Sequence, residues 1–296
     1  MSEAFQRFLK TRVYENTATA EEILADLQSI RSLDKQKESE TMKFGCGGAL
    51  LIPLALVGML FGESQPLLAG IWVVSLLAVA IVAIVFAVKA HHYDVEDRRY
   101  EMMHSVMDLL RRDIAADTPV AVMLSLKPVA TRENFQTKGK VGVWDFKLYH
   151  DDWMRVEAKL LDGTLCRVEL TERHQQRSRW KTSASGKSKH KSKTKSCLAA
   201  NVRLKPKTHR YTKLSEIGQQ AAGAVQLPPW AALKGIAVED GGLAIKAFTK
   251  TEWNAPSLGK SSDTPHGIHL VAMMLLSLYQ VLNLSRVITK AERDAE

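Results

Sequence analysis

Two long apolar runs separated by a short polar turn constrain this chain more than any other feature. Residues 44–62 form a stretch of 19 residues without a charge, and residues 64–88 add 25 more. A helix of about 20 apolar residues crosses the hydrocarbon core of a bilayer, so each run is long enough to span it. The sequence therefore predicts a two-helix transmembrane hairpin over residues 44–90, with a buried hairpin of a soluble protein as the alternative.

Basic residues near these runs indicate an orientation. The turn at residues 62–66 holds no Lys or Arg, whereas the outer flanks carry Lys35, Lys37, Lys43, Lys89, Arg98 and Arg99. Because basic flanks stay on the cytoplasmic side, both termini are expected in the cytoplasm. Neither run carries an ionisable side chain, which favours an anchor over a transport path. The predicted location is multi-pass, in a bacterial inner membrane or a plasma membrane.

Helical patterns flank the hairpin on both sides. Residues 1–43 are expected to form an N-terminal cytoplasmic arm, with a helix that begins at the capping-box pair Thr19 and Glu22. Residues 91–117 carry an apolar seam at heptad-like spacing, made of Tyr100, Met103, Met107, Leu110 and Ile114. We expect this segment to pair with the N-terminal arm as a helical stalk. Packing on the following domain or on another copy of the chain is the alternative.

Residues 118–296 are predicted to form a cytoplasmic β-rich domain. Strands are expected over 120–126 and 141–149, followed by a meander whose alternating apolar positions are even-numbered: Met154, Val156, Ala158, Leu160, Cys166, Val168, Leu170, Leu198, Ala200, Val202 and Leu204. A further hairpin is expected over 236–248. Residues 268–285 are uncharged and are expected to form a helix covering the sheet, a third span being the alternative. The predicted fold class is α+β: a two-helix transmembrane hairpin, a helical stalk and a cytoplasmic antiparallel β-meander domain covered by a C-terminal helix.

The turns of the meander predict its register. Two strands share one core face only if paired residue numbers have an even sum, because a slip by one residue turns every side chain over. A three-residue loop ending in Gly186 meets this condition, places Leu170 opposite Ala200 and gives Gly the position that favours a left-handed backbone. The same loop type at Gly163 places Leu160 opposite Thr164.

This register gathers positive charge on one face of a protruding hairpin over residues 172–197. The candidate polyanion-binding residues are nine cations at odd positions: Arg173, Arg177, Arg179, Lys181, Lys187, Lys189, Lys191, Lys193 and Lys195. The stretch 173–213 holds 14 Lys and Arg and no Asp or Glu, so the rest of a chain of net charge +9 carries −5. Like charges opposite one another destabilise a ribbon, which favours an anionic partner. A flexible, solvated lysine loop is the alternative.

Catalytic and metal-binding patterns fail on inspection. Gly186-Lys187-Ser188 resembles the end of a phosphate-binding loop, but Lys181 occupies the position of the first glycine. The pair His91-His92 has no carboxylate or Cys cluster beside it, and Asp151-Asp152 is interpreted as ordinary carboxylates at a loop end. The three cysteines lack ligand spacing. We therefore expect no enzyme activity, no metal and no cofactor.

The predicted function is a non-enzymatic, membrane-anchored adaptor or scaffold whose basic hairpin binds a polyanion. Anionic lipid headgroups are the favoured partner because basic segments are attracted to the cytoplasmic leaflet. The alternative is a subunit of an oligomeric membrane complex, including a homo-oligomer, that contacts acidic proteins or nucleic acid. An enzyme without a recognisable motif is the third reading.

Overall fold

The structure is a computed structural model. It describes residues 2–36, 97–183, 185–207, 225–239, 241–249 and 266–293, together with isolated positions between these ranges. By their contacts, Met1–Leu27 and Glu96–Glu296 form one compact unit and Gln28–Val95 a second. The sheet, its helices and the basic hairpin all belong to the first unit.

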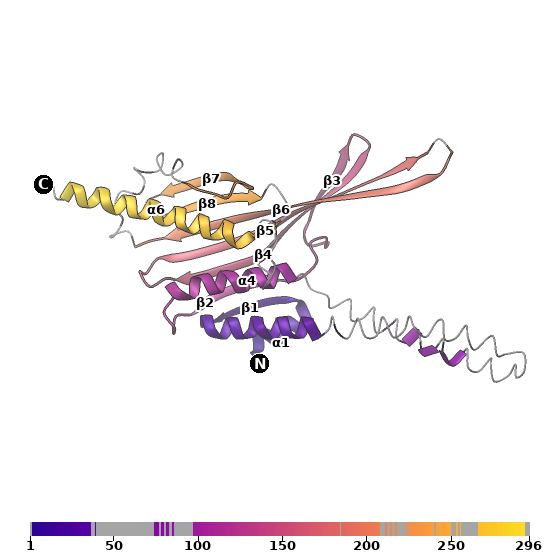
Figure 1. Cartoon of the computed structure of the whole chain (residues 1–296), viewed down its shortest axis with the longest axis horizontal. Coiled ribbons are helices and arrows are strands. Elements are labelled where there is room, and N and C mark those ends of the chain that lie inside the picture. Colours follow the sequence, from indigo (N-terminus) through magenta and orange to yellow (C-terminus); the bar gives the residue numbers. More distant parts are fainter. Residues whose placement is uncertain are drawn as a thin grey trace, which may run out of the picture. The chain divides into compact units, whose positions relative to one another are not determined.

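An eight-stranded antiparallel sheet forms most of this unit (Figure 1). Its strand order is β1-β2-β4-β5-β6-β8-β7, and β3 pairs with β4 off this path. The strands are β1 Val13–Ala18, β2 Val120–Ser125, β3 Phe135–Val141, β4 Trp144–Lys159, β5 Leu165–Thr182, β6 Ser188–Lys205, β7 Ala231–Glu239 and β8 Gly242–Thr249. The three central strands are much longer than the others, with 16 residues in β4 and 18 in each of β5 and β6.

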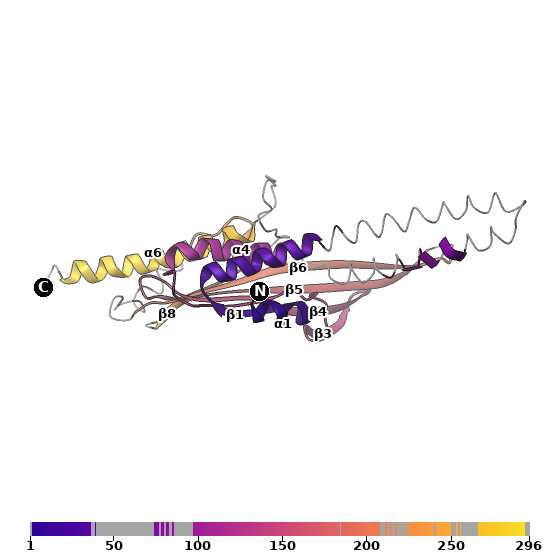
Figure 2. The same cartoon turned by 90° about the horizontal axis from the view of Figure 1, so that it is seen from below.

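Helices cover one face of the sheet. The helix α4 (Asp97–Leu110), which continues into the short 3-10 helix η1 (Arg111–Asp113), and the helix α6 (Gly267–Arg293) lie on the same side of the strands (Figure 2). The covered face is apolar because alternate strand positions are apolar, and Val168, Val202 and Ile245 on it are fully buried. The N-terminal helix α1 (Glu3–Thr11) packs beside β1. The hydrophobic core therefore lies between the sheet and the helices α4 and α6.

The predicted fold class is wrong. The described residues form mostly an eight-stranded antiparallel sheet with one apolar C-terminal helix, in place of the predicted two-helix transmembrane hairpin, helical stalk and β-meander domain. Among them, only the segment Gly267–Ile288 of α6 is long and apolar enough to cross a bilayer, and 50% of its most apolar window is buried inside the protein. The apolar runs 44–62 and 64–88 lie outside the described residues apart from isolated positions. The predicted domain boundaries and membrane location stay predictions.

The helix α4 packs on the β domain and does not form the predicted stalk. The seam residues Tyr100, Met103 and Met107 are buried, together with Met102 and Val106, so α4 has a wider apolar face than a coiled-coil seam requires. That face packs against β2, β4 and α6. The alternative of packing on the β domain is the one found. The capping box at Thr19 is confirmed, since its backbone N–H donates to Glu22 Oε2 at 3.0 Å.

The predicted register is confirmed at both hairpins. Leu170 pairs with Ala200 and Val168 with Val202 across β5 and β6. Gly186 has φ +78° and its N–H donates to the carbonyl oxygen of Ser183 at 2.9 Å. At the β4–β5 turn, Gly163 has φ +85° and the N–H of Leu160 donates to the carbonyl oxygen of Thr164.

Two features of β3 and β4 differ from the expected strand over 141–149. The chain turns at Gly142, where φ is +58°, so this segment contains a hairpin between β3 and β4. A β-bulge between Asp152 and Met154 then shifts the register of β4 against β5. The bulge lets Trp153 and Met154 both be buried, and it places the even-numbered residues of early β4 on the same face as the odd-numbered residues of β5.

Candidate polyanion-binding site

The basic hairpin grows directly out of the sheet. Strand β8 leaves β6 after Ala199, and β4 stays paired with β5 as far as Ser178. The base of the hairpin is therefore a four-stranded sheet of β3, β4, β5 and β6. Only beyond Ser178 do β5 and β6 continue as a two-stranded ribbon, which Figure 1 shows projecting from the sheet beside the β3–β4 hairpin. An isolated hairpin is marginal in water, so the shared base is what supports this one.

The register brings the nine predicted cations to one face. Lys181 pairs with Lys189, Arg179 with Lys191 and Arg177 with Lys193. Lys187 lies at the turn, Lys195 faces Gln175, and Arg173 faces Cys197 at the base. The lysines of β6 and the turn are exposed, whereas Arg177 and Arg179 are half-buried by their neighbours.

This face has no internal charge compensation. Within the part of the chain that the structure describes, no carboxylate forms an ion pair with any of the nine cations. Three pairs of like charges therefore lie directly opposite one another, an arrangement that costs stability. An anion on this face would remove that repulsion.

Strand β4 adds an apolar row to the cationic face, which sequence reasoning missed. The residues Trp144, Phe146 and Leu148 share this face because of the register shift at the bulge. The guanidinium carbon of Arg179 lies 4.5 Å from the centre of the Trp144 ring, and Lys193 Nζ lies 5.6 Å from it. These are cation–π contacts. The alternation of Trp144, Phe146 and Leu148 is visible in the sequence. The bulge that determines which face these residues share is not visible there.

The opposite face of the same four strands carries a shallow groove of about 750 Å³. Hydroxyl and amide side chains of β5 and β6 line it, and β3 and β4 contribute three exposed lysines, Lys138, Lys140 and Lys147. Lys140 Nζ lies 3.7 Å from Asp145 Oδ1. This face therefore carries fewer cations than the cationic face, and the charge of one of them, Lys140, is partly neutralised by Asp145.

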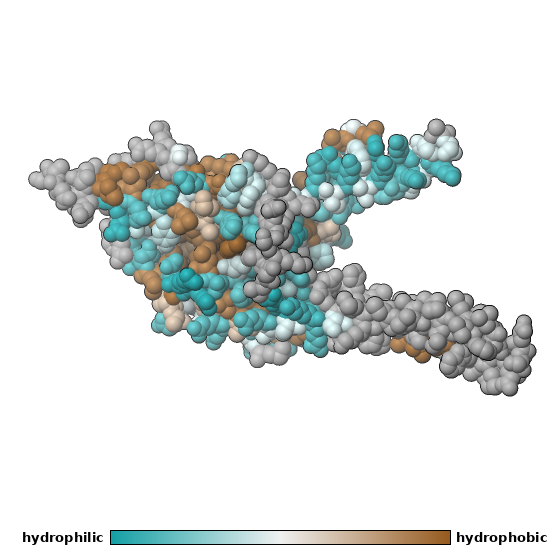
Figure 3. Space-filling model, viewed as in Figure 1, coloured by the Kyte–Doolittle hydropathy of each residue, from teal (hydrophilic) through white to brown (hydrophobic). Residues whose placement is uncertain are grey.

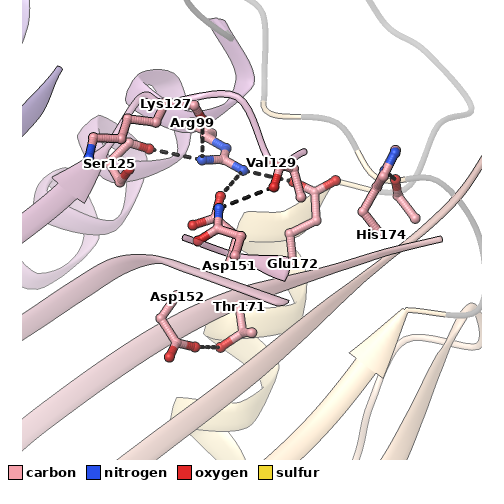
Figure 4. A network of polar contacts seen from close by, with 11 residues as sticks. Arg99, Ser125, Lys127, Val129, Asp151, Asp152, Thr171, Glu172 and His174 are labelled. Atoms are coloured by element: carbon pink, nitrogen blue, oxygen red, sulfur yellow. Dashed lines mark hydrogen bonds and ion pairs between the residues drawn. The ribbon is translucent and has the colours of Figure 1, made fainter. Parts of the chain in front are cut away.

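A buried ion cluster lies where the basic hairpin leaves the core (Figure 4). Arg99, whose side chain is 0% exposed, points between two carboxylates, with Nη2 at 2.7 Å from Asp151 Oδ2 and 3.1 Å from Glu172 Oε2. Its Nη1 donates to the carbonyl oxygens of Ser125 and Lys127 at 3.0 and 3.2 Å. Arg99 thereby joins α4 to β2, β4 and β5.

Aromatic rings cover this cluster. The guanidinium carbon of Arg99 lies 5.2 Å from the ring centre of Trp153, which stacks on Trp253 at 5.6 Å with an interplanar angle of 12°. Burial in these surroundings raises the pKa of the Asp151 carboxyl, an effect that the charge of Arg99 partly offsets. Burial lowers the pKa of the nearby His174, whose Nδ1 lies 2.7 Å from Ser196 Oγ.

The cluster corrects two sequence-based interpretations. Asp151 is a buried strand residue and not an ordinary carboxylate at a loop end, whereas Asp152 lies on the open face and accepts a hydrogen bond from Thr171 Oγ1. Arg99 is expected from the sequence to be a cytoplasmic flanking charge, but it is buried and its charge is paired with two carboxylates inside the fold. Because Arg99 and Asp151 are 52 positions apart, no local pattern could pair them.

The described residues offer no group of three or more metal-ligating side chains. Comparison with known protein families, curated proteins and solved structures finds no match to this chain. Its function must therefore be inferred from its own geometry.

Proposed function

We propose that this protein is a non-enzymatic adaptor that binds a polyanion through the cationic face of the basic hairpin over residues 172–197, the β5–β6 arm. Anionic lipid headgroups are the first candidate. The observation that carries the proposal is the uncompensated face itself: nine cations in register, with like charges opposite one another and no carboxylate paired with them in the described chain.

The energetics favour a ligand with many closely spaced negative charges. Each Lys or Arg near an anionic membrane surface contributes about 1 kcal/mol, and the attraction falls off within a Debye length of about 8–10 Å. Rows of cations along one face of the ribbon can engage several neighbouring headgroups at the same time. A single small anion would meet only one or two of them.

The alternative is a subunit of an oligomeric complex whose arm contacts nucleic acid or an acidic protein. Nucleic acid would also neutralise the rows, and its binding would fall steeply with salt because condensed counterions are released. Only the cations of the β5–β6 arm support this alternative, because its paired lysines and arginines have no base-specific arrangement.

Two triple variants of equal charge change test the proposal. Lys191→Gln/Lys193→Gln/Lys195→Gln removes three cations from the proposed face, and Lys138→Gln/Lys140→Gln/Lys147→Gln removes three from the opposite face. At about 1 kcal/mol per lysine, the first variant should weaken binding roughly a hundredfold at low salt. The second should have a much smaller effect.

The assay is co-sedimentation of the full-length protein with phosphatidylcholine vesicles with and without phosphatidylserine, and fluorescence titration with polyuridylate RNA, across a salt series. Equal losses in the two variants would show a general charge effect and refute a specific face. Unchanged binding in the first variant would remove the arm from the function.

A further inference from the structure

The turn between β3 and β4 presents apolar side chains to water. Val141 and Val143, on either side of Gly142, are 51% and 70% exposed. Figure 3 shows apolar surface at the end of this hairpin, beside the hydrophilic β5–β6 arm. The fold buries little of either side chain, and adjacent exposed apolar residues at the end of a projecting hairpin form a candidate interaction surface.

The register places Val141 of this turn on the cationic face. Val141 pairs with Trp144, whose ring contacts Arg179, and Arg179 pairs with Lys191. One row across four strands thus runs from an aliphatic residue through an indole to two cations. A flat surface that meets the lysines of β6 would meet the β3–β4 turn as well.

A bilayer interface suits this row better than nucleic acid does. Aliphatic side chains gain free energy in the acyl-chain boundary, tryptophan prefers the headgroup level, and basic residues attract anionic headgroups. Nucleic acid would use exposed aromatic faces for stacking. Here Arg179 and Lys193 lie over the ring of Trp144 at 4.5 and 5.6 Å, which leaves its face less open to a base.

We infer that the β3–β4 turn is an apolar wedge, made by Val141 and Val143, that inserts into an anionic bilayer while the β5–β6 cations hold the headgroups. The inference rests on the proposed function and names its partner as a lipid surface. Binding then has two parts, an electrostatic part that salt removes and an apolar part that salt leaves.

The test variant is Val141→Ser/Val143→Ser in the full-length protein. The matched control is Leu161→Ser/Leu165→Ser, which changes two leucines that are 67% and 50% exposed at the β4–β5 turn, at the other end of β4. The valine variant should partition about tenfold less into phosphatidylcholine–phosphatidylserine vesicles, because each substitution removes apolar area that the bilayer would bury. The leucine control should partition like the unchanged protein. Val141→Leu/Val143→Leu should partition more strongly.

Binding to polyuridylate separates this inference from the proposed function. The valine variant should bind RNA as well as the unchanged protein, and the binding to vesicles that survives high salt should be lost only in that variant. Unchanged vesicle partitioning of the valine variant, with a loss in Lys191→Gln/Lys193→Gln/Lys195→Gln, would overturn the wedge and leave the cationic face standing. Binding of the unchanged protein to RNA but not to vesicles would also overturn it.

Discussion

Replacing Arg99 with Met should be among the most destabilising single changes in the sheet unit. The side chain is 0% exposed and lies 2.7 and 3.1 Å from two buried carboxylates. Its removal leaves Asp151 and Glu172 buried without a counter-charge, and it also leaves the carbonyl oxygens of Ser125 and Lys127 without their donor. Breaking a buried ion pair from one side costs about 3–5 kcal/mol.

The cost should depend on which partner is removed. Asp151→Asn keeps an oxygen that accepts from Arg99 and leaves one cation facing one carboxylate, so it should cost less than about 1 kcal/mol. The triple variant Arg99→Met/Asp151→Asn/Glu172→Gln removes all three charges and should recover much of the loss seen with Arg99→Met alone, because no unpaired charge stays buried.

The pH dependence supplies a second check. A carboxyl whose pKa is raised in the folded state binds a proton more tightly there than in the unfolded chain, so stability falls as pH rises through the folded pKa. Without Arg99 the pKa of Asp151 should rise further. The deficit of Arg99→Met should therefore shrink as the pH is lowered from neutral towards the ordinary carboxyl range.

Urea unfolding followed by circular dichroism and tryptophan fluorescence would measure these free energies, with Trp153 as a buried reporter. The control is Arg111→Met, whose ion pair with Asp108 is half-exposed and should contribute little. A loss below about 1 kcal/mol for Arg99→Met, or the same loss at all pH values, would refute the account of the cluster.

Three further predictions have defined outcomes. Gly163→Ala should destabilise the β4–β5 turn by about 1–2 kcal/mol in thermal unfolding, because φ is +85° there and the added methyl would meet the side chain of Lys207, whereas Gly142→Ala would meet nothing and should cost less. Cys166 should resist Ellman's reagent until the protein unfolds, because burial raises the pKa of its thiol to about 12, and Cys197 should react before it. His174→Gln should reduce the loss of stability as the pH falls through about 6.5, because burial lowers the pKa of His174 and the unfolded chain binds that proton more readily; an unchanged pH profile would contradict this.

The register of the arm was predictable because its determinants are local. The even-numbered apolar positions and two glycines at turn positions restrict the pairing of β5 with β6, and the structure has that pairing. The hairpin at residues 236–248 is found for the same reason, with Glu239 paired to Gly242.

Features set by distant contacts were not predictable. The bulge in β4 sets the face of Trp144, and it lies where the consecutive residues Trp153 and Met154 are both buried in the core. Strand β1 is short and mostly polar, and only its pairing with β2 makes it a strand. The predicted fold class is wrong because it rests on the two apolar runs and treats residues 91–117 as a stalk. The wide apolar face of α4 packs against the sheet instead.

The continuity of β5 and β6 from core to turn has a consequence for distance. Both strands run without a break in pairing from the buried pair Val168–Val202 to Thr182–Ser188. Arg99, in the first turn of α4, joins β4 and β5 through Asp151 and Glu172. Ten residues of strand between Leu198 and Ser188 extend roughly 33 Å. The β5–β6 arm can therefore present its outermost cations well beyond Ala199, the last residue of β6 that pairs with β8.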